Sequence, residues 1–474
     1  PLCEILFILP KIQIDSNRHE LQFVSERSCT DLCYPGRHSL FYDIIGTGSL
    51  QEVKNRMSKF TKRGVALPFL KEPAASRPIK NIASPAQVIV PLLAGDGSNC
   101  RPVIKVFDTV LRGEILARPA QKGGCPIYSP VTGIYAGVRT ILHPLMGSIS
   151  CAVLDCMVSG AEQRNEKPVD KLTDNQILEL AFGRGIADEL DGELLASKLA
   201  AWRKADNVTL VADGSEQEPY SSAASAVLNE SAEKVQEGLE LAARAVGTKK
   251  FHIAVKLPKK RFDELELRIP GENLYSVRGK YPAKTAPEKE RTVCRIGVQA
   301  CLALYRAAAC GEPHCDCVVT VAGDAVANPQ NVRVPFGTPV EDILHFCGLA
   351  FDPDYIILGD AMTGVTVQTT DVPLVPGITC ILALKSRVQP PLHTCIGCGR
   401  CVRSCHAGLL PFEIMRRLDN MQYERLASLL PEDCDGCGAC SHVCPAGLDV
   451  TAKVLEAREA HGNIFMKWGD GDEL

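Results

Sequence analysis

Two cysteine runs near the C-terminal end constrain this chain more than any other feature. They read Cys395-Ile-Gly-Cys398-Gly-Arg-Cys401-Val-Arg-Ser-Cys405 and Cys434-Asp-Gly-Cys437-Gly-Ala-Cys440-Ser-His-Val-Cys444. Each follows the spacing C-x2-C-x2-C-x3-C, in which three thiolates of one tight loop reach three irons of a 4Fe-4S cube and the fourth cysteine serves the other cube. The spacing therefore predicts two 4Fe-4S clusters, the first held by Cys395, Cys398, Cys401 and Cys444 and the second by Cys434, Cys437, Cys440 and Cys405.

Zinc and disulfides are the alternative uses of such cysteines. A zinc site usually takes two C-x2-C pairs and does not need a third cysteine in the same loop. A disulfide framework would be an unusual reason for two matching runs. We expect the fourth cysteine of each run to start a helix. One departure is His406, which follows the first run where proline is usual; it is either a hydrogen-bond donor that tunes a cluster or a tolerated substitution.

Length and charge bound the remaining possibilities. With 474 residues the chain is long enough for about three domains. Its net charge of −4 gives no basic field for nucleic acid. Cluster thiolates must stay reduced, which predicts a reducing, cytoplasmic compartment. No apolar run approaches the length of a membrane helix.

The two ends of the chain are expected to lie outside the folded domains. Residues 1–78 are interpreted as a leader, disordered or not native before Met57, because they show no sustained helical or strand period and begin with Pro1. Residues 461–474 are interpreted as an acidic tail.

Residues 79–155 consist of short apolar runs separated by turn residues, which predicts strands. The segments around Val110 and Ser129-Pro-Val-Thr-Gly133 resemble the flattened barrel of lipoyl and biotinyl domains, also called a barrel-sandwich hybrid. Such domains carry a modified lysine at a hairpin tip. Here the strand groups are joined by Gln121-Lys122-Gly-Gly, a loop and not a hairpin tip, so a structural role is favoured over a carrier role.

Residues 165–295 alternate helix and strand, which predicts an α/β domain with a parallel sheet. Helices are expected from Thr173 to Gly183, over 193–205, from Ser222 to Gly247 and over 261–267, and strands over 208–212, 251–255 and 274–277. Ligands of such sheets bind beyond the C-terminal strand ends. That edge is Asp213-Gly-Ser-Glu216-Gln-Glu218-Pro-Tyr220, whose carboxylates are either solvated turn residues or ligand-binding groups.

The remaining segments complete a multidomain α/β chain. A helix is expected over 293–308. Residues 313–388 alternate strands with a helix from Val340 to Cys347, which predicts a β-grasp module of the SLBB type. Residues 389–460 form the dicluster ferredoxin-like domain, which ends in a helix near 450–460.

This order of parts resembles the RnfC subunit of the Rnf electron-transport complex, over roughly residues 79–460. The best-matched segments, besides the cysteine runs, are Lys105-Val-Phe-Asp-Thr-Val-Leu-Arg-Gly, Glu216-Gln-Glu-Pro-Tyr220, Val318-Val-Thr-Val-Ala-Gly and Pro335-Phe-Gly-Thr-Pro. The central part is also similar to the flavin-bearing subunit of respiratory complex I. The resemblance implies a peripheral subunit on the cytoplasmic membrane face that exchanges electrons with NAD(H) through FMN and two clusters, with Glu218 at the nicotinamide or flavin edge.

The flavin loop is where the sequence departs from the family. The family's loop G-x-G-G-A-G-F-P-T offers amides to the FMN phosphate. Here the stretch is Phe182-Gly-Arg-Gly-Ile-Ala-Asp-Glu-Leu-Asp-Gly192, which loses the glycine core and introduces Asp188, Glu189 and Asp191. Like charges repel a phosphate, so this loop disfavours FMN and NAD(H) as ligands.

Two functions of different classes remain. The first is a flavin-free protein that passes electrons through two clusters between a redox enzyme and ferredoxin, a flavoprotein or a membrane partner. The second is an FMN-dependent subunit of a ferredoxin:NAD oxidoreductase, which oxidises NADH or reduces NAD. The loss of glycines favours the first.

Overall fold

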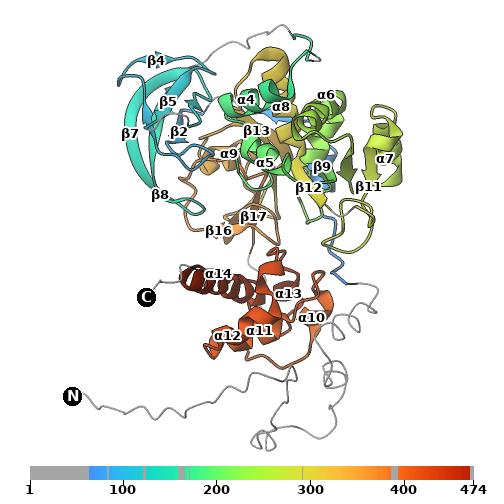
Figure 1. The fold of residues 1–474 in the computed structure, drawn as a ribbon. Coiled ribbons are helices and arrows are strands. Elements are labelled where there is room, and N and C mark those ends of the chain that lie inside the picture. The colour runs from blue at the N-terminus through green and yellow to red at the C-terminus, as the bar shows by residue number, and fades with distance from the viewer. Residues whose placement is uncertain are drawn as a thin grey trace, which may run out of the picture. The chain divides into compact units, whose positions relative to one another are not determined.

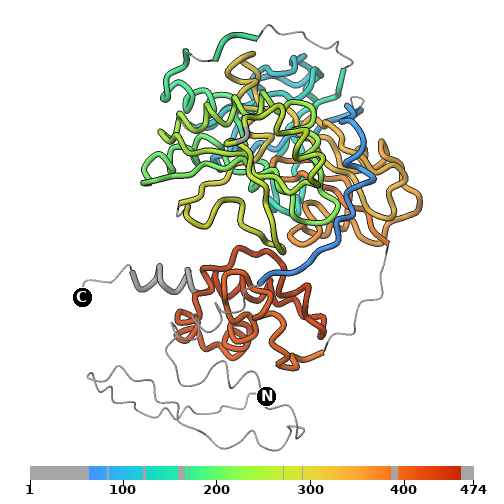
Figure 2. Tube along the Cα trace, turned by 90° about the vertical axis from the view of Figure 1, so that its right-hand side faces the viewer, coloured from blue at the N-terminus to red at the C-terminus, as the bar shows by residue number. Residues whose placement is uncertain are grey.

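The computed structural model describes residues 63–82, 85–120, 124–157, 166–169, 171–290, 292–385 and 393–469. The leader before Met57 and the loop at 121–123 lie outside these ranges. The interpretation of residues 63–78 as leader is wrong, because Val65 is buried in a β-bridge with Tyr281 and the helix α3 (Glu72–Ala75) follows. These residues, blue in Figure 2, run from Gly64, whose amide donates to the Ser404 carbonyl (3.1 Å), toward the strand β1 (Lys80–Asn81).

The first domain is built from two antiparallel sheets. One has the order β2-β8-β7-β4 and the other β3-β5-β6. The strands are β2 (Gln87–Pro91), β3 (Cys100–Pro102), β4 (Thr109–Val110), β5 (Ile115–Pro119), β6 (Ile127–Tyr128), β7 (Gly133–His143) and β8 (Gly147–Cys156). Their inward side chains, among them Val88, Leu116 and Leu154, are fully buried. The short strands therefore close over one apolar core, as the alternation of apolar runs and turns predicts.

The second domain contains a four-stranded parallel sheet of order β11-β10-β9-β12, which confirms the predicted parallel arrangement. The strands are β9 (Val208–Gly214), β10 (Phe251–Val255), β11 (Leu274–Ser276) and β12 (Thr292–Gly297), and the helices are α4 (Asp174–Gly183), α5 (Leu195–Trp202), α6 (Ala223–Val246), α7 (Lys259–Glu266) and α8 (Val298–Cys310), with the 3₁₀ turn η1 (Gly271–Asn273). Local signals set the helix ends. Thr173 forms a capping box with Gln176, and Gly247 ends α6 with φ of +82°.

The predicted helix over 293–308 starts too early. Residues 292–297 form the edge strand β12, which pairs in parallel with β9, and α8 begins only at Val298. The two longest helices of the domain, α6 and α8, approach closely, because a Cβ added at Gly238 would lie 1.9 Å from the carbonyl oxygen of Cys301. Gly238 is therefore required by helix packing rather than by a turn.

The third domain is a six-stranded mixed sheet of order β1-β14-β13-β17-β15-β16. Its elements are β13 (Asp316–Ala322), β14 (Gln330–Pro335), α9 (Val340–Cys347), β15 (Tyr355–Leu358), β16 (Val365–Val367) and β17 (Cys380–Leu384). The core is formed by Val319, Val332, Ile343 and Ile381, all fully buried. The helix α9 has the bounds that its apolar spacing predicts.

The C-terminal domain is helical in all its described elements (Figure 1). It contains α10 (Arg400–Ser404), α11 (Pro411–Asp419), α12 (Tyr423–Leu426), the 3₁₀ turns η2 (Ala427–Leu429) and η3 (Pro431–Asp433), α13 (Ala439–His442) and α14 (Val450–Gly469). The last helix extends past residue 460, so residues 461–469 of the predicted acidic tail are helical. Among the described helices, none has both the length and the apolar character needed to cross a membrane.

Candidate iron–sulfur centres

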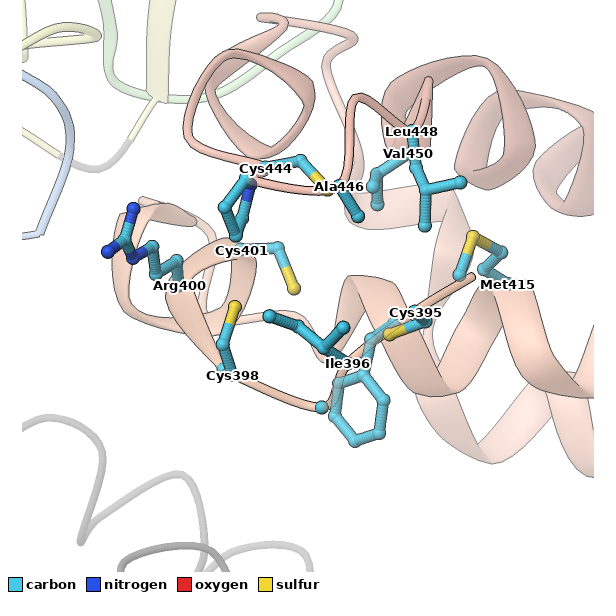
Figure 3. Close-up of a pocket in the computed structure, with 14 residues that line it drawn as sticks. Cys395, Ile396, Cys398, Arg400, Cys401, Met415, Cys444, Ala446, Leu448 and Val450 are labelled. Atoms are coloured by element: carbon cyan, nitrogen blue, oxygen red, sulfur yellow. The ribbon is translucent and has the colours of Figure 1, made fainter. Parts of the chain in front are cut away.

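The first cysteine pocket combines one triplet with the last cysteine of the other run. Cys395, Cys398, Cys401 and Cys444 line it (Figure 3). The rest of its wall is largely apolar and includes Ile396, Phe412, Met415, Ala446, Leu448 and Val450. Cys395 and Cys398 are exposed, whereas Cys401 is buried. The pocket thus has one face toward solvent.

The second cysteine pocket has the complementary composition. Cys405, Cys434, Cys437 and Cys440 line it, together with Leu409, Pro411, Thr451 and Val454. Two sulfurs already have polar neighbours, since the Leu409 amide donates to Cys405 Sγ (3.4 Å) and Thr451 Oγ1 lies 3.2 Å from Cys440 Sγ. Each pocket therefore joins cysteines from both runs, although the runs are separated by the helices α11 and α12.

Left-handed glycines shape both loops. Gly397, Gly399, Gly436 and Gly438 all have φ between +65° and +76°, a region that side chains other than glycine rarely adopt. Gly438 is also sterically constrained, because an added Cβ would lie 2.6 Å from the Met362 carbonyl oxygen. These turns let three cysteines of one loop face a common centre.

The fourth cysteines do not start helices, which corrects the expectation from sequence. Cys401 lies inside α10, and Cys405 ends that helix with extended dihedral angles (φ −67°, ψ 114°). Cys440 lies inside α13, and Cys444 follows Val443, which ends it. The short helix begins at the left-handed glycine, so it is already complete when the fourth cysteine is reached.

Burial favours the neutral form of the buried thiols in both pockets. It raises the pKa of the Cys401 thiol to about 11 and that of Cys437 to about 12. Iron binds thiolates, so loading of either pocket releases protons, and the gain from metal coordination must exceed this cost. The first pocket is small and apolar, offers four thiol ligands and has no carboxylate among its described lining residues. Such a pocket suits an iron–sulfur cluster.

His406 lies at the second pocket. Its Nε2 is 2.8 Å from Asp435 Oδ2, and these two side chains and the Cys437 thiol offer atoms within 4.8 Å of one another. The imidazole thus bonds to a carboxylate rather than to any cysteine sulfur that the structure describes.

The glutamates at the edge of the parallel sheet form hydrogen bonds within the protein. The Glu216 carboxylate accepts the amides of Ala224 (2.7 Å) and Ser225 (3.1 Å) at the start of α6. Glu218 is only 6% exposed and accepts hydrogen bonds from Tyr281, from Thr363 and from the Met362 amide. The interpretation of these two as solvated turn residues is therefore wrong. The sequence offers no local signal for the burial of Glu218, because its partners Tyr281 and Thr363 are distant in the chain.

The acidic loop of residues 183–192 is folded onto α8. Glu189 is only partly exposed, and its two carboxyl oxygens accept the amides of Gln299 (2.5 Å) and Ala300 (2.9 Å). Burial and the neighbouring Asp188 charge raise the pKa of Glu189 to about 8, although the two amides oppose this shift. The Asp188 carboxylate accepts the Gly297 amide (2.9 Å) and pairs with Lys198 Nζ (2.6 Å). These acids thus bind the protein's own donors.

The loop amides are also engaged. The N–H groups of Gly185, Ile186 and Gly192 donate to main-chain carbonyls, and that of Ala187 donates to His314 Nδ1 (3.2 Å). A phosphate nest needs several converging free amides. In the described loop these four amides already donate to acceptors within the protein, so they are not free to bind a phosphate.

Three family models match the chain. They are the RnfC barrel sandwich hybrid domain over residues 59–157, the SLBB domain over 318–366 and the 4Fe-4S dicluster domain over 394–448. These matches support the predicted barrel, β-grasp and ferredoxin-like parts.

Curated relatives extend the similarity across most of the chain. The C subunit of the ion-translocating oxidoreductase complex of Rhodobacter capsulatus is 29% identical over 74% of this chain and 73% of its own length. The C subunit of the Na(+)-translocating ferredoxin:NAD(+) oxidoreductase complex of Acetobacterium woodii is 29% identical over 77% of this chain and 89% of its own length. The resemblance to the RnfC family is therefore confirmed.

Among solved structures, an NAD+-reducing [NiFe]-hydrogenase in the H2-reduced state aligns with a TM-score of 0.40 and 15% identity, over 63% of this chain and 62% of that one. A likeness at this level carries no functional conclusion.

Proposed function

We propose that this chain, which is similar to RnfC proteins over about three quarters of its length, is an iron–sulfur electron-transfer protein that carries electrons through two 4Fe-4S clusters. The observation that carries the proposal is the pair of four-thiol pockets. Cys395, Cys398, Cys401 and Cys444 would hold the first cluster, and Cys405, Cys434, Cys437 and Cys440 the second. A bound cluster supplies one-electron transfer, at a potential set by burial and by hydrogen bonds to sulfur.

The two pockets suit different positions on an electron path. The first has exposed Cys395 and Cys398, with Ile396, a residue that is 67% exposed, between them. The second lies against Tyr281, which bonds to the Cys437 carbonyl. We therefore propose that the cluster of the first pocket exchanges electrons with a protein partner, namely ferredoxin, a flavoprotein or a subunit of a membrane complex. Peripheral association with the cytoplasmic face of a membrane would follow from such a partner.

The domain division predicted from sequence is part of this proposal. It comprises 79–155 for the barrel, 165–295 for the α/β domain, 313–388 for the β-grasp and 389–460 for the dicluster domain. The family matches support three of these segments. The segment 63–78, which contains buried residues, is included in the folded part of the chain.

The second candidate, an FMN-dependent subunit acting on NAD(H), is disfavoured by the loop at 183–192. Its amides are committed to internal hydrogen bonds, and Glu189 occupies the N-terminal amides of α8. The residues present therefore do not fit an FMN phosphate, and no step of the proposed function passes through a flavin.

Cluster content tests the proposal directly. The full chain purified without oxygen is expected to contain about eight irons and eight acid-labile sulfides, since each of two cubes holds four of each. Metal analysis and sulfide determination provide the measurement, with reduction by dithionite followed by electron paramagnetic resonance. Stoichiometric zinc with little iron would disprove the proposal.

Flavin binding is a separate test. The loss of two or three charge-assisted hydrogen bonds, each worth roughly 1.5–3 kcal/mol, is expected to weaken FMN binding to about millimolar or beyond. Calorimetry on cluster-replete protein measures this. A micromolar dissociation constant, together with weaker NADH-driven cluster reduction in Glu218→Gln, would restore the FMN-dependent candidate.

A further inference from the structure

Tyr281 connects a buried carboxyl group to the second cysteine pocket. Its hydroxyl oxygen lies 2.9 Å from Glu218 Oε1 and 2.8 Å from the backbone carbonyl oxygen of Cys437. Both are acceptors, but a phenol has one hydrogen to donate. The Tyr281 hydrogen can therefore serve only one of the two at a time, and the choice depends on the charge of Glu218.

The protonation state of Glu218 decides which bond forms. An ionised carboxylate is the stronger acceptor, so it holds the Tyr281 hydrogen. A protonated Glu218 is itself a donor to the Tyr281 oxygen, and the Tyr281 hydrogen then turns to the Cys437 carbonyl. The Met362 amide (2.6 Å) and the Thr363 hydroxyl (3.0 Å) hold the carboxyl group in place.

The surroundings of Glu218 are charged and poorly solvated. Lys71, Asp360 and the Cys380 thiol face Glu218, and the ammonium group of Lys71 donates to the Glu216 backbone carbonyl. The Glu216 carboxyl group faces Lys71 and Asp360, Lys256 faces Lys71, and Asp435 faces Tyr281. Asp360 Oδ1 is buried and has no hydrogen-bond partner among the described residues. The carboxyl groups thus outnumber the ammonium groups next to them, so one added proton relieves repulsion.

Burial favours the neutral carboxyl forms at this site. It raises the pKa of Glu218, and burial together with the Glu218 charge raises the pKa of Asp360 to about 7. Burial also lowers the pKa of Lys71. Burial therefore favours proton uptake by these carboxyl groups.

We propose that Glu218 takes up one proton from solvent when the second pocket's iron–sulfur cluster is reduced, and that Tyr281 links the two events. The inference rests on the proposed function of that pocket. One electron comes from a reduced protein partner, or from dithionite in the test, and one proton passes from a hydronium ion of the solvent, which becomes water, to the Glu218 carboxylate. The electron and the proton together leave the net charge of the protein unchanged. The Tyr281 hydrogen turns from Glu218 to the Cys437 carbonyl, and within the protein the only covalent bond that changes is the new O–H of Glu218.

The test is a redox titration of the cluster-loaded full chain at several pH values. The midpoint potential of the second cluster is expected to fall with rising pH over part of the range, by at most about 59 mV for each tenfold change in proton concentration, the one-electron limit. The first cluster serves as the internal control and stays flat. Glu218→Gln is expected to remove the slope, and Tyr281→Phe to reduce it by about half or more.

An infrared readout identifies the proton acceptor. Reduction is expected to produce the carbonyl band of a protonated carboxylic acid in wild type and in Asp360→Asn, but not in Glu218→Gln. A pH-independent second cluster in wild type, a slope unaffected by Tyr281→Phe, or loss of the band only in Asp360→Asn would each overturn the inference. Iron content is measured first, to distinguish failure of the proposed function from failure of the proton coupling. Absence of clusters refutes the proposed function, whereas intact clusters whose potential does not depend on pH refute the proton coupling alone.

Discussion

Cys405→Ser is expected to remove the cluster of the second pocket and to leave the first, although Cys405 belongs to the first run. The thiol lines the second pocket and is among the groups that, after burial, raise the pKa values of Cys434, Cys437 and Cys440. Serine is a poor ligand for iron in place of thiolate. Iron content is expected to fall by about half, because one of two four-iron cubes is lost.

Double variants show which cluster is lost. Cys405→Ser combined with Cys437→Ala is expected to retain as much iron as either single variant, because both act on one pocket. Cys405→Ser combined with Cys398→Ala is expected to lose nearly all iron. Cys444→Ser is the matched control and should behave in the opposite way. If Cys405→Ser with Cys398→Ala still holds half of the iron, the assignment of ligands to pockets is wrong.

Lys198→Met is expected to destabilise the α/β domain by about 3–5 kcal/mol, the usual effect of removing one partner from a buried ion pair. Lys198 is 9% exposed and pairs with Asp188, which is fully buried (2.6 Å). Burial alone would lower the pKa of Lys198, but the Asp188 charge raises it above its usual value, so the ammonium group stays charged. Its loss would leave the Asp188 carboxylate in the interior without a counterion.

Urea unfolding followed by tryptophan fluorescence measures this effect, since Lys198 Nζ lies 5.5 Å from the ring centroid of Trp202. The control is Lys284→Met, which breaks an exposed pair with Glu288 (3.5 Å) and should change stability by about 0–0.5 kcal/mol. Adding Asp188→Asn to Lys198→Met is expected to recover part of the loss. Equal effects of Lys198→Met and Lys284→Met would show that the buried pair contributes no more than a surface pair.

Much of the α/β domain follows from local signals. The helix from Thr173 to Gly183 is fixed by a capping box and the helix after Ser222 by Gly247, and both have the predicted ends within one residue. The strand Thr292–Gly297 is not recognisable from the sequence, because its alternation is short and runs directly into a helix. Only its pairing with β9 identifies it as a strand.

The sequence by itself determined the chemistry of the C-terminal domain, because ligand type and spacing are local properties. Thiols at C-x2-C-x2-C-x3-C spacing predict two four-thiol centres before any packing is known. Only the tertiary structure decided which groups the acidic side chains of Glu189 and Glu218 bind. Glu189 binds the amides of α8 and Glu218 meets Tyr281 because segments far apart in the chain pack together. An acidic residue in a loop is expected to be solvated until its distant donors are known, since burial and pKa depend on neighbours that no local pattern encodes.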